Sequence, residues 1–258
     1  MNVDDHNQSA WDSAAKNNSR WSLPCSDQSI EHARTGKCLV KLTPTKYVPV
    51  HWLNEILAKD ILIVAGGGGQ QAPILAASGA NVTLLDISAE QIAIDKKVCE
   101  YHGLHLNLHL GSFRDMAKLG DSKFDLIFNP VSNCFFENLT EFWDLANYVL
   151  RPKGKVLTGF INPIAFQFDF EKANIGEFTL KYPQPYSDIK SLSEQEKKRF
   201  LHENTPLEFG HALSEQLGVP TEKGFRMSGF YEDGWGECID RPIDNFFPQF
   251  MAARFDKV

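Results

Sequence analysis

Four consecutive glycines, Gly66 to Gly69, are the feature of this 258-residue sequence whose residue types most directly suggest chemistry. They follow the apolar run Ile61–Ala65 and precede a helical pattern that begins near Pro73. Proline is favoured in a first helical turn because it has no N–H to leave unpaired. Residues without a Cβ let the backbone approach a ligand closely, so that amide donors and a helix N-terminus face its polar groups. The loop is therefore predicted to bind a ligand.

An acidic residue, Asp86, follows Gly67 by 19 positions and ends the next apolar run. A carboxylate at this position of a β-α-β unit can accept hydrogen bonds from both hydroxyls of a ribose. The glycine loop and Asp86 together predict a cofactor that contains a nucleoside. Gly67, Gly69 and Ala72 also satisfy the dinucleotide fingerprint G-x-G-x-x-[GA], so the loop alone leaves a nicotinamide dinucleotide open.

Short apolar runs alternate with helix-length segments between Ile61 and Ile161, which is typical of β-α-β units around a parallel sheet. The expected strands are Ile61–Ala65, Val82–Asp86, Leu106–Leu110, Phe124–Asn129 and Lys155–Phe160. The expected helices are Ala72–Ser78, Ala89–Tyr101, Thr140–Leu150 and Ser193–His202. Two later apolar runs, Phe225–Tyr231 and Phe246–Phe255, are expected to form a terminal strand pair.

The chain is expected to fold as a single domain, because α/β folds of about 250 residues routinely form one unit. Within it we distinguish four segments by composition. They are an N-terminal arm (1–45), a cofactor-binding core (46–161), an insertion that covers the substrate (162–220) and the terminal strand pair (221–258).

Composition narrows the class of protein further. Hydrophobic residues make up 43% and charged residues 23% of the chain, as in ordinary globular proteins. The net charge of -7 argues against a nucleic-acid partner. Five widely spaced cysteines without a C-x-x-C pair favour reduced thiols and no metal site. No apolar run approaches the roughly 18 residues of a membrane span, and the start of the chain is polar. We expect a cytoplasmic protein without a membrane partner, its oligomeric state open.

Two sequence strings carry a resemblance to a known family. AGGGGQQAPILAASGA (65–80) and FDLIFNPVSN (124–133) are similar to class I S-adenosylmethionine-dependent methyltransferases. More narrowly, they resemble a bacterial small-molecule-type group whose substrates are mostly unassigned. The resemblance implies an α/β, Rossmann-like class I methyltransferase fold, with a seven-stranded, mostly parallel sheet and an antiparallel last strand. It also implies S-adenosyl-L-methionine as cofactor and in-line methyl transfer to a small-molecule acceptor.

The cofactor-binding residues implied by the resemblance lie at the carboxyl ends of parallel strands, where open α/β sheets bind ligands. Those under the methionine part are Ala65, Gly67 and Gly69, in a loop that also supplies Gly66 and Gln70. Those for the ribose and the adenine are Asp86, Ile87, Ser112 and Phe113. Those bordering the sulfonium and the acceptor are Asn129, Pro130 and Val131.

The acceptor site is expected outside the core sheet, around Leu42–Trp52 and in the insertion, where aromatic and proline residues cluster. The side chains there and nearby with useful hydrogen-bonding chemistry are Tyr47, His51, Asn133, Tyr186, Asp188 and His211. His211 and Tyr186 are the predicted catalytic residues. An imidazole pKa of about 6.5 suits a general base, although a histidine beside an apolar helical stripe is also a common structural residue.

Two alternative functions stay open at this point. A nicotinamide-dependent oxidoreductase would use the same glycine loop, and a parallel last strand would favour it over a methyltransferase. A catalytically silent S-adenosylmethionine-binding domain is motivated by Ile63 and Ser112, which stand where the family usually has acidic residues.

Overall fold

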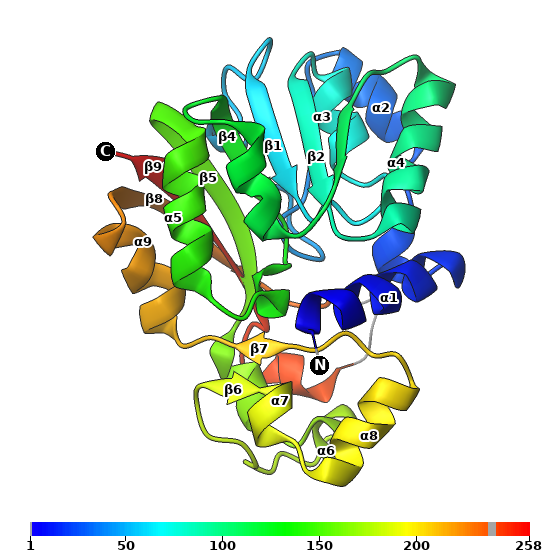
Figure 1. The fold of residues 1–258 in the computed structure, drawn as a ribbon, viewed down its shortest axis with the longest axis vertical. Helices are drawn as coiled ribbons and strands as arrows, with labels where there is room; N and C mark the ends of the chain where they lie inside the picture. Colours follow the sequence, from blue (N-terminus) through cyan, green and yellow to red (C-terminus); the bar gives the residue numbers. More distant parts are fainter. Residues whose placement is uncertain (1, 237–240) are drawn as a thin grey trace.

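The computed structural model describes residues 2–236 and 241–258 and is built around a seven-stranded sheet (Figure 1). Its strands are β1 (Asp60–Val64), β2 (Asn81–Asp86), β3 (Asn107–Leu110), β4 (Phe124–Asn129), β5 (Leu150–Ile161), β8 (Phe225–Asp233) and β9 (Phe250–Lys257). The spatial order is β3-β2-β1-β4-β5-β9-β8. The pairs from β3 to β5 are parallel, whereas β9 is antiparallel to both of its neighbours. The predicted sheet and its terminal strand pair are confirmed.

The central strands are apolar along their whole length because both of their faces are covered. β1 and β4 pair in register from Ile61 opposite Leu126, and only the first residue of β1 and the second of β4 are less than fully buried. One face packs on α2 (Asp27–Arg34) and α3 (Ala72–Ala77), and the other on α5 (Leu139–Val149). Helices thus enclose the sheet and leave its strand ends free to build a site.

The crossover helices begin and end within one residue of the predicted positions. The Ser88 hydroxyl accepts a hydrogen bond from the Gln91 N–H at 3.1 Å and caps α4 (Ala89–His102). Gly103 ends this helix with a φ of +63°, in the left-handed region that glycine adopts without cost. α3 carries Pro73 in its first turn, as expected.

The N-terminal arm is more regular than its composition suggests. It contains α1 (Val3–Lys16), which lies across the beginning of α4, and α2. The Asp12 carboxylate in α1 accepts hydrogen bonds from the Ser88 hydroxyl at 2.6 Å and from the Glu90 N–H at 3.2 Å. This contact holds α1 close to the carboxyl ends of β1 and β2.

The insertion forms a small layer below the sheet (Figure 1). It contains α6 (Phe170–Asn174), β6 (Tyr186–Ser187), α7 (Asp188–Ser191), α8 (Glu194–His202) and β7 (Phe209–Gly210). β6 and β7 form an antiparallel pair, and Phe166, Tyr182 and Tyr186 pack together beneath it. We call residues 162–210 the cap, since they face the strand ends.

Short helices are the remaining elements of the described chain. They are η1 (Arg20–Ser22), η2 (Val50–Trp52), η3 (Phe113–Leu119), η4 (Asn133–Phe135), η5 (Pro163–Gln167), η6 (Ser214–Gly218), α9 (Val219–Glu222) and η7 (Pro242–Asn245). Of the five cysteines, Cys238 lies outside the described residues, and the other four form no disulfide in the described part of the chain. None of the described helices is long and apolar enough to cross a membrane.

Candidate active site

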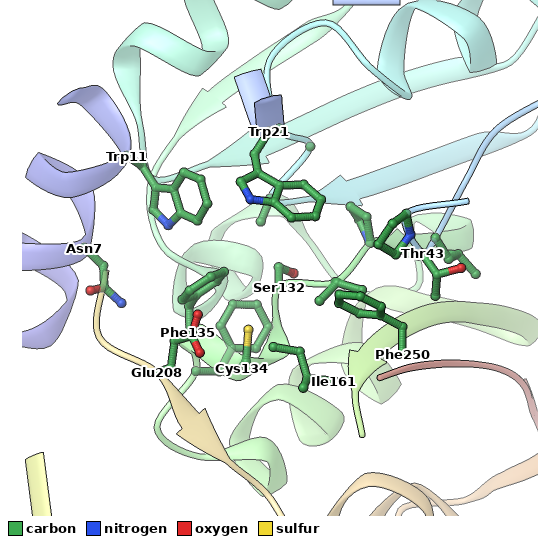
Figure 2. Close-up of a pocket in the computed structure, with 18 of the residues that line it drawn as sticks. Asn7, Trp11, Trp21, Thr43, Ser132, Cys134, Phe135, Ile161, Glu208 and Phe250 are labelled. Atoms are coloured by element: carbon green, nitrogen blue, oxygen red, sulfur yellow. The ribbon is translucent and has the colours of Figure 1, made fainter. Parts of the chain in front are cut away.

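A cavity of about 600 Å³ lies at the carboxyl ends of the central strands (Figure 2). Its floor comes from the loops that follow β1, β2, β3 and β4. Its other walls come from α1, η1, residues 41–44 and the cap. Trp235 and residues between 241 and 250 close the remaining side. Elements distant in sequence therefore converge on one enclosed space, which is the candidate active site.

The glycine loop enters this cavity with a backbone shape that side chains would obstruct. Gly67 has a φ of +67°, and a Cβ built on it would lie 3.0 Å from the carbonyl oxygen of Trp21. A Cβ on Gly66 would lie 2.6 Å from Cδ1 of Leu84. Both positions line the cavity, so the loop presents bare backbone to whatever occupies it.

Asp86 presents a carboxylate to the same space. It is 5% exposed and lines the cavity. One carboxylate oxygen accepts from the Gly66 N–H at 3.0 Å and the other from the Ser88 N–H at 2.8 Å. Burial raises the pKa of Asp86 to about 6, and these backbone hydrogen bonds oppose the rise. Each oxygen keeps a second lone pair, so the group can accept further hydrogen bonds.

Most of the predicted cofactor-binding residues line the cavity. They are Ala65, Gly66, Gly67, Gln70, Asp86, Ile87, Ser112, Phe113, Pro130 and Val131. Gly69 instead packs on the arm, where its carbonyl accepts from the Cys25 N–H at 2.8 Å.

Asn129 does not line the cavity, although the sequence placed it there. It is fully buried. Its amide donates to the Val64 carbonyl at 3.2 Å and to the Ser132 hydroxyl at 2.6 Å, and its oxygen accepts from Thr158 at 3.0 Å. Asn129 therefore links the ends of β1, β4 and β5, and its hydrogen bond to Ser132 fixes the loop that follows β4.

The two predicted catalytic residues lie outside the cavity wall. His211 is 5% exposed, and its Nε2 donates to the Phe136 carbonyl at 2.8 Å. Burial lowers the pKa of His211, which favours the neutral ring. The Tyr186 hydroxyl donates to the Asp188 carboxylate, and burial raises the pKa of Tyr186 above its usual range. Both side chains are committed to contacts within the fold.

The other candidates for the acceptor site do not reach the cavity either. Tyr47 is 52% exposed and His51 is also exposed. Asn133 donates to the Gln216 side chain at 2.8 Å. Of the predicted arm segment 42–52, only Leu42, Thr43 and Pro44 line the cavity.

Several cavity residues were missed by the sequence reasoning. Trp11 and Trp21 face the space from the arm, and Glu208 faces it from the cap, beside Cys134 and Phe135 (Figure 2). The only signal in the sequence was the presence of two tryptophans in an otherwise polar arm.

A second buried carboxyl, Asp95 of α4, offers a test of the electrostatics around the glycine loop. It is 0% exposed, and neither of its oxygens has a hydrogen-bond partner among the described residues. Burial raises the pKa of Asp95 to about 8, against a smaller opposing effect of the Gly69 N–H. The folded protein therefore keeps this carboxyl protonated at pH values where the unfolded chain releases the proton.

We expect Asp95→Asn to stabilise the protein at pH 8 by a few kcal/mol, because the amide does not titrate and each unit by which burial raises the carboxyl pKa costs the wild type about 1.4 kcal/mol at that pH. Because the pKa of Asp95 is raised in the folded state, its contribution to the free energy of unfolding of the wild type is fully present below about pH 4. This contribution is lost as the pH rises to about 8. The gain should therefore vanish near pH 4. Urea unfolding at several pH values measures it, with Asp121→Asn on the exposed surface as control. A gain independent of pH would contradict the assignment.

Comparison with known proteins identifies the class to which this fold and cavity belong. A family model described as a methyltransferase domain matches residues 62–158. An uncharacterized methyltransferase of Bacillus subtilis (strain 168), YbaJ, is 38% identical over 241 residues, which cover 93% of this chain and 94% of that protein.

Solved structures share the fold at low sequence identity. A proposed S-adenosylmethionine dependent methyltransferase from Listeria monocytogenes superposes with a TM-score of 0.64 at 13% identity, over 81% of this chain and 94% of that chain. An S-adenosylmethionine dependent methyltransferase from Mesorhizobium loti gives a TM-score of 0.59 at 14% identity, over 81% and 95% of the two chains.

The strand order and the antiparallel β9 are shared with these structures, and the 38% identical relative and the family model identify the protein as an S-adenosylmethionine-dependent methyltransferase. The chain belongs to the class I family of these enzymes, and S-adenosylmethionine is its cofactor. The resemblance seen in the two sequence strings is confirmed. The parallel last strand that would have favoured a nicotinamide-dependent oxidoreductase is absent from the described sheet.

Proposed function

We propose that this enzyme transfers a methyl group to a small-molecule acceptor by in-line displacement. The observation that carries the proposal is a single cavity that runs from the glycine loop to the cap and the arm. Its volume of about 600 Å³ falls within the range of about 300 to 1,000 Å³ typical of small-molecule sites.

We propose that the floor of the cavity holds the cofactor. The glycine positions, at which a Cβ would meet neighbouring atoms, and the free lone pairs of Asp86 fit a nucleoside with an attached amino acid. The methionine part would be held by Ala65, Gly66, Gly67 and Gln70. The ribose and adenine would be held by Asp86, Ile87, Ser112 and Phe113. Pro130 and Val131 would border the reacting groups.

The bound cofactor supplies a methyl group on a positively charged sulfur, which is already activated for transfer. The task left to the protein is to orient the acceptor and to exclude water. Aromatic side chains from three parts of the chain support this role, because Trp11, Phe135 and Phe250 line the remaining walls. Such a lining would exclude water from the reacting groups.

Thermal unfolding with different ligands tests the cofactor part. A ligand present at about 100 times its dissociation constant adds roughly 2.7 kcal/mol to stability. We expect S-adenosylmethionine and S-adenosylhomocysteine to raise the unfolding temperature, and NAD and NADP to leave it unchanged. A shift with the dinucleotides alone would overturn the proposed cofactor residues.

The acceptor part is tested by S-adenosylhomocysteine formation with fractions of a cell extract. We expect turnover with the low-molecular-mass fraction and none with dialysed protein or purified nucleic acid. Turnover that occurs only with a macromolecular fraction would refute a small-molecule acceptor.

A further inference from the structure

One carboxyl group in the cavity has no use in the fold. Glu208 lies just before β7, and its side chain faces the cavity. Its own N–H donates to the Asp188 carboxylate at 2.7 Å. In the described part of the chain, no donor reaches the Glu208 carboxyl oxygens, and no Lys, Arg or His nitrogen lies within 4.0 Å of them. The contact that this group lacks must come from a ligand or from water.

The side chains around Glu208 are mostly apolar, and the one nearby amide, Asn7, is hydrogen-bonded to the Leu207 backbone at 3.1 and 2.8 Å. Figure 2 shows Glu208 beside Cys134 and Phe135, with Trp11 and Trp21 across the cavity. Trp11 packs edge-on against Phe135 at 5.1 Å between ring centroids.

The titratable groups that interact electrostatically with Glu208 are acids. Asp188 and Tyr186 of the cap, and Cys134 of η4, act on it or feel its charge. Burial and the nearby Asp188 raise the pKa of Glu208 to about 8. The Glu208 carboxyl therefore lacks a cationic partner among the described residues.

The other charged residues of the cavity wall have partners of their own, apart from Asp86 in the floor. Lys41 lies 5.0 Å from the ring centroid of Tyr47. Asp4 pairs with Arg114 at 3.1 Å. Arg20 and Arg241 each lie 5.0 Å from the ring centroid of Trp235. These groups lie on α1, η1, residues 41–44 and the C-terminal segment, and none is within ion-pair distance of Glu208.

We propose that the acceptor is a small primary or secondary amine that enters as an ammonium ion, and that Glu208 binds this ion and takes its proton. The inference rests on the proposed small-molecule function and names the acceptor class and the base. Aromatic faces around a carboxylate attract cations, and a carboxylate gains most from a charged hydrogen-bond donor. A neutral alcohol would leave both contacts weak.

The reaction then balances as follows. The ammonium gives one proton to the Glu208 carboxylate, which frees the nitrogen lone pair. A nitrogen–carbon bond forms while the sulfur–carbon bond breaks, leaving a methylated ammonium and a neutral thioether. Glu208 later returns its proton to solvent. A carboxyl with a raised proton affinity suits this role, because proton transfer is easiest between groups of similar pKa.

Binding of paired probes to the S-adenosylhomocysteine complex tests the proposal without turnover. The probes are 2-phenylethylamine against 2-phenylethanol, and tryptamine against tryptophol. We expect each amine to bind at least tenfold more tightly than its alcohol. At pH 7 the amine should release close to one proton on binding, since Glu208 is mostly protonated beforehand. Calorimetry in buffers of different ionisation enthalpy measures this release.

Glu208→Gln should abolish both the preference for amines and the proton release, with S-adenosylhomocysteine affinity unchanged. Glu203→Gln makes the same chemical change on the exposed surface five residues earlier and should behave as wild type. Equal binding of amines and alcohols, no binding of any amine, or a preference that survives in Glu208→Gln would each overturn the proposal.

Different results would refute the amine acceptor and the small-molecule acceptor. If S-adenosylmethionine binds and an alcohol or thiol is methylated at the same rate by wild type and Glu208→Gln, the amine inference is wrong and the small-molecule function stands. If only macromolecules are methylated, both are wrong.

Discussion

Gly67→Ala is expected to weaken S-adenosylmethionine binding by about a hundredfold, or about 2.7 kcal/mol. The new methyl group would lie 3.0 Å from the backbone carbonyl of Trp21, at a residue whose φ is +67°. The loop can relieve this contact only by moving, and Gly67 lines the cavity. Isothermal titration of the variant with the cofactor measures the loss.

Gly103→Ala is the matched control. Gly103 has nearly the same φ, +63°, but no atom lies within 4 Å of its would-be Cβ. Both substitutions carry the left-handed strain of about 1 to 2 kcal/mol in stability, and only Gly67→Ala should lose affinity. An equal loss in the two variants would mean that the effect comes from stability and not from the loop.

Asp86→Ala is expected to reduce cofactor affinity by about 1 to 3 kcal/mol, which is the cost of leaving charged hydrogen bonds unmade. Asp86→Asn should lose less, because its amide keeps one acceptor oxygen and the volume of the side chain. In Asp86→Ala, the ribose hydroxyls would lose the carboxylate acceptor at the end of β2. Calorimetric titration of both variants gives the two values.

The pH dependence separates this role from a purely structural one. The pKa of Asp86 is raised to about 6, and the ionised form is the better acceptor. Wild-type affinity for S-adenosylhomocysteine should therefore fall as pH drops below about 6. The Asp86→Asn variant has no such proton to gain, so its affinity should stay flat between pH 5 and 7. A parallel fall in both proteins would place the titrating group elsewhere.

The sheet and the cofactor loop were predictable because local rules decide them. Apolar runs with two covered faces, a capping serine at Ser88 and a left-handed glycine at Gly103 each mark an element by its own residues. The pairing of β8 with β9 was also predicted, since both strands are short apolar runs near the end of the chain, although their register was not.

The acceptor half of the site was not predictable in the same way. Asn129 and His211 have the chemistry of site residues. Their side chains nevertheless point away from the cavity, because they hydrogen-bond to the backbone carbonyls of Val64 and Phe136. Conversely, α1 has few apolar residues, and contacts with distant segments hold it at the cavity, among them Asp12 with the start of α4 and Asn7 with Leu207. Glu208 sits beside a two-residue strand whose pairing with β6 cannot be read from spacing. Contacts between distant segments decide these positions.

The antiparallel course of β9 has a practical consequence for handling the protein. β9 starts at Phe250, in the cavity wall, and runs away from it to Lys257 at the opposite end of the strands, whereas α1 begins beside the cavity (Figure 1). An affinity tag or fluorescent fusion placed before α1 would emerge next to the site and compete with the packing of the arm. The same fusion placed after β9 would leave the molecule on the far side, so carboxyl-terminal fusions are the ones suited to binding assays.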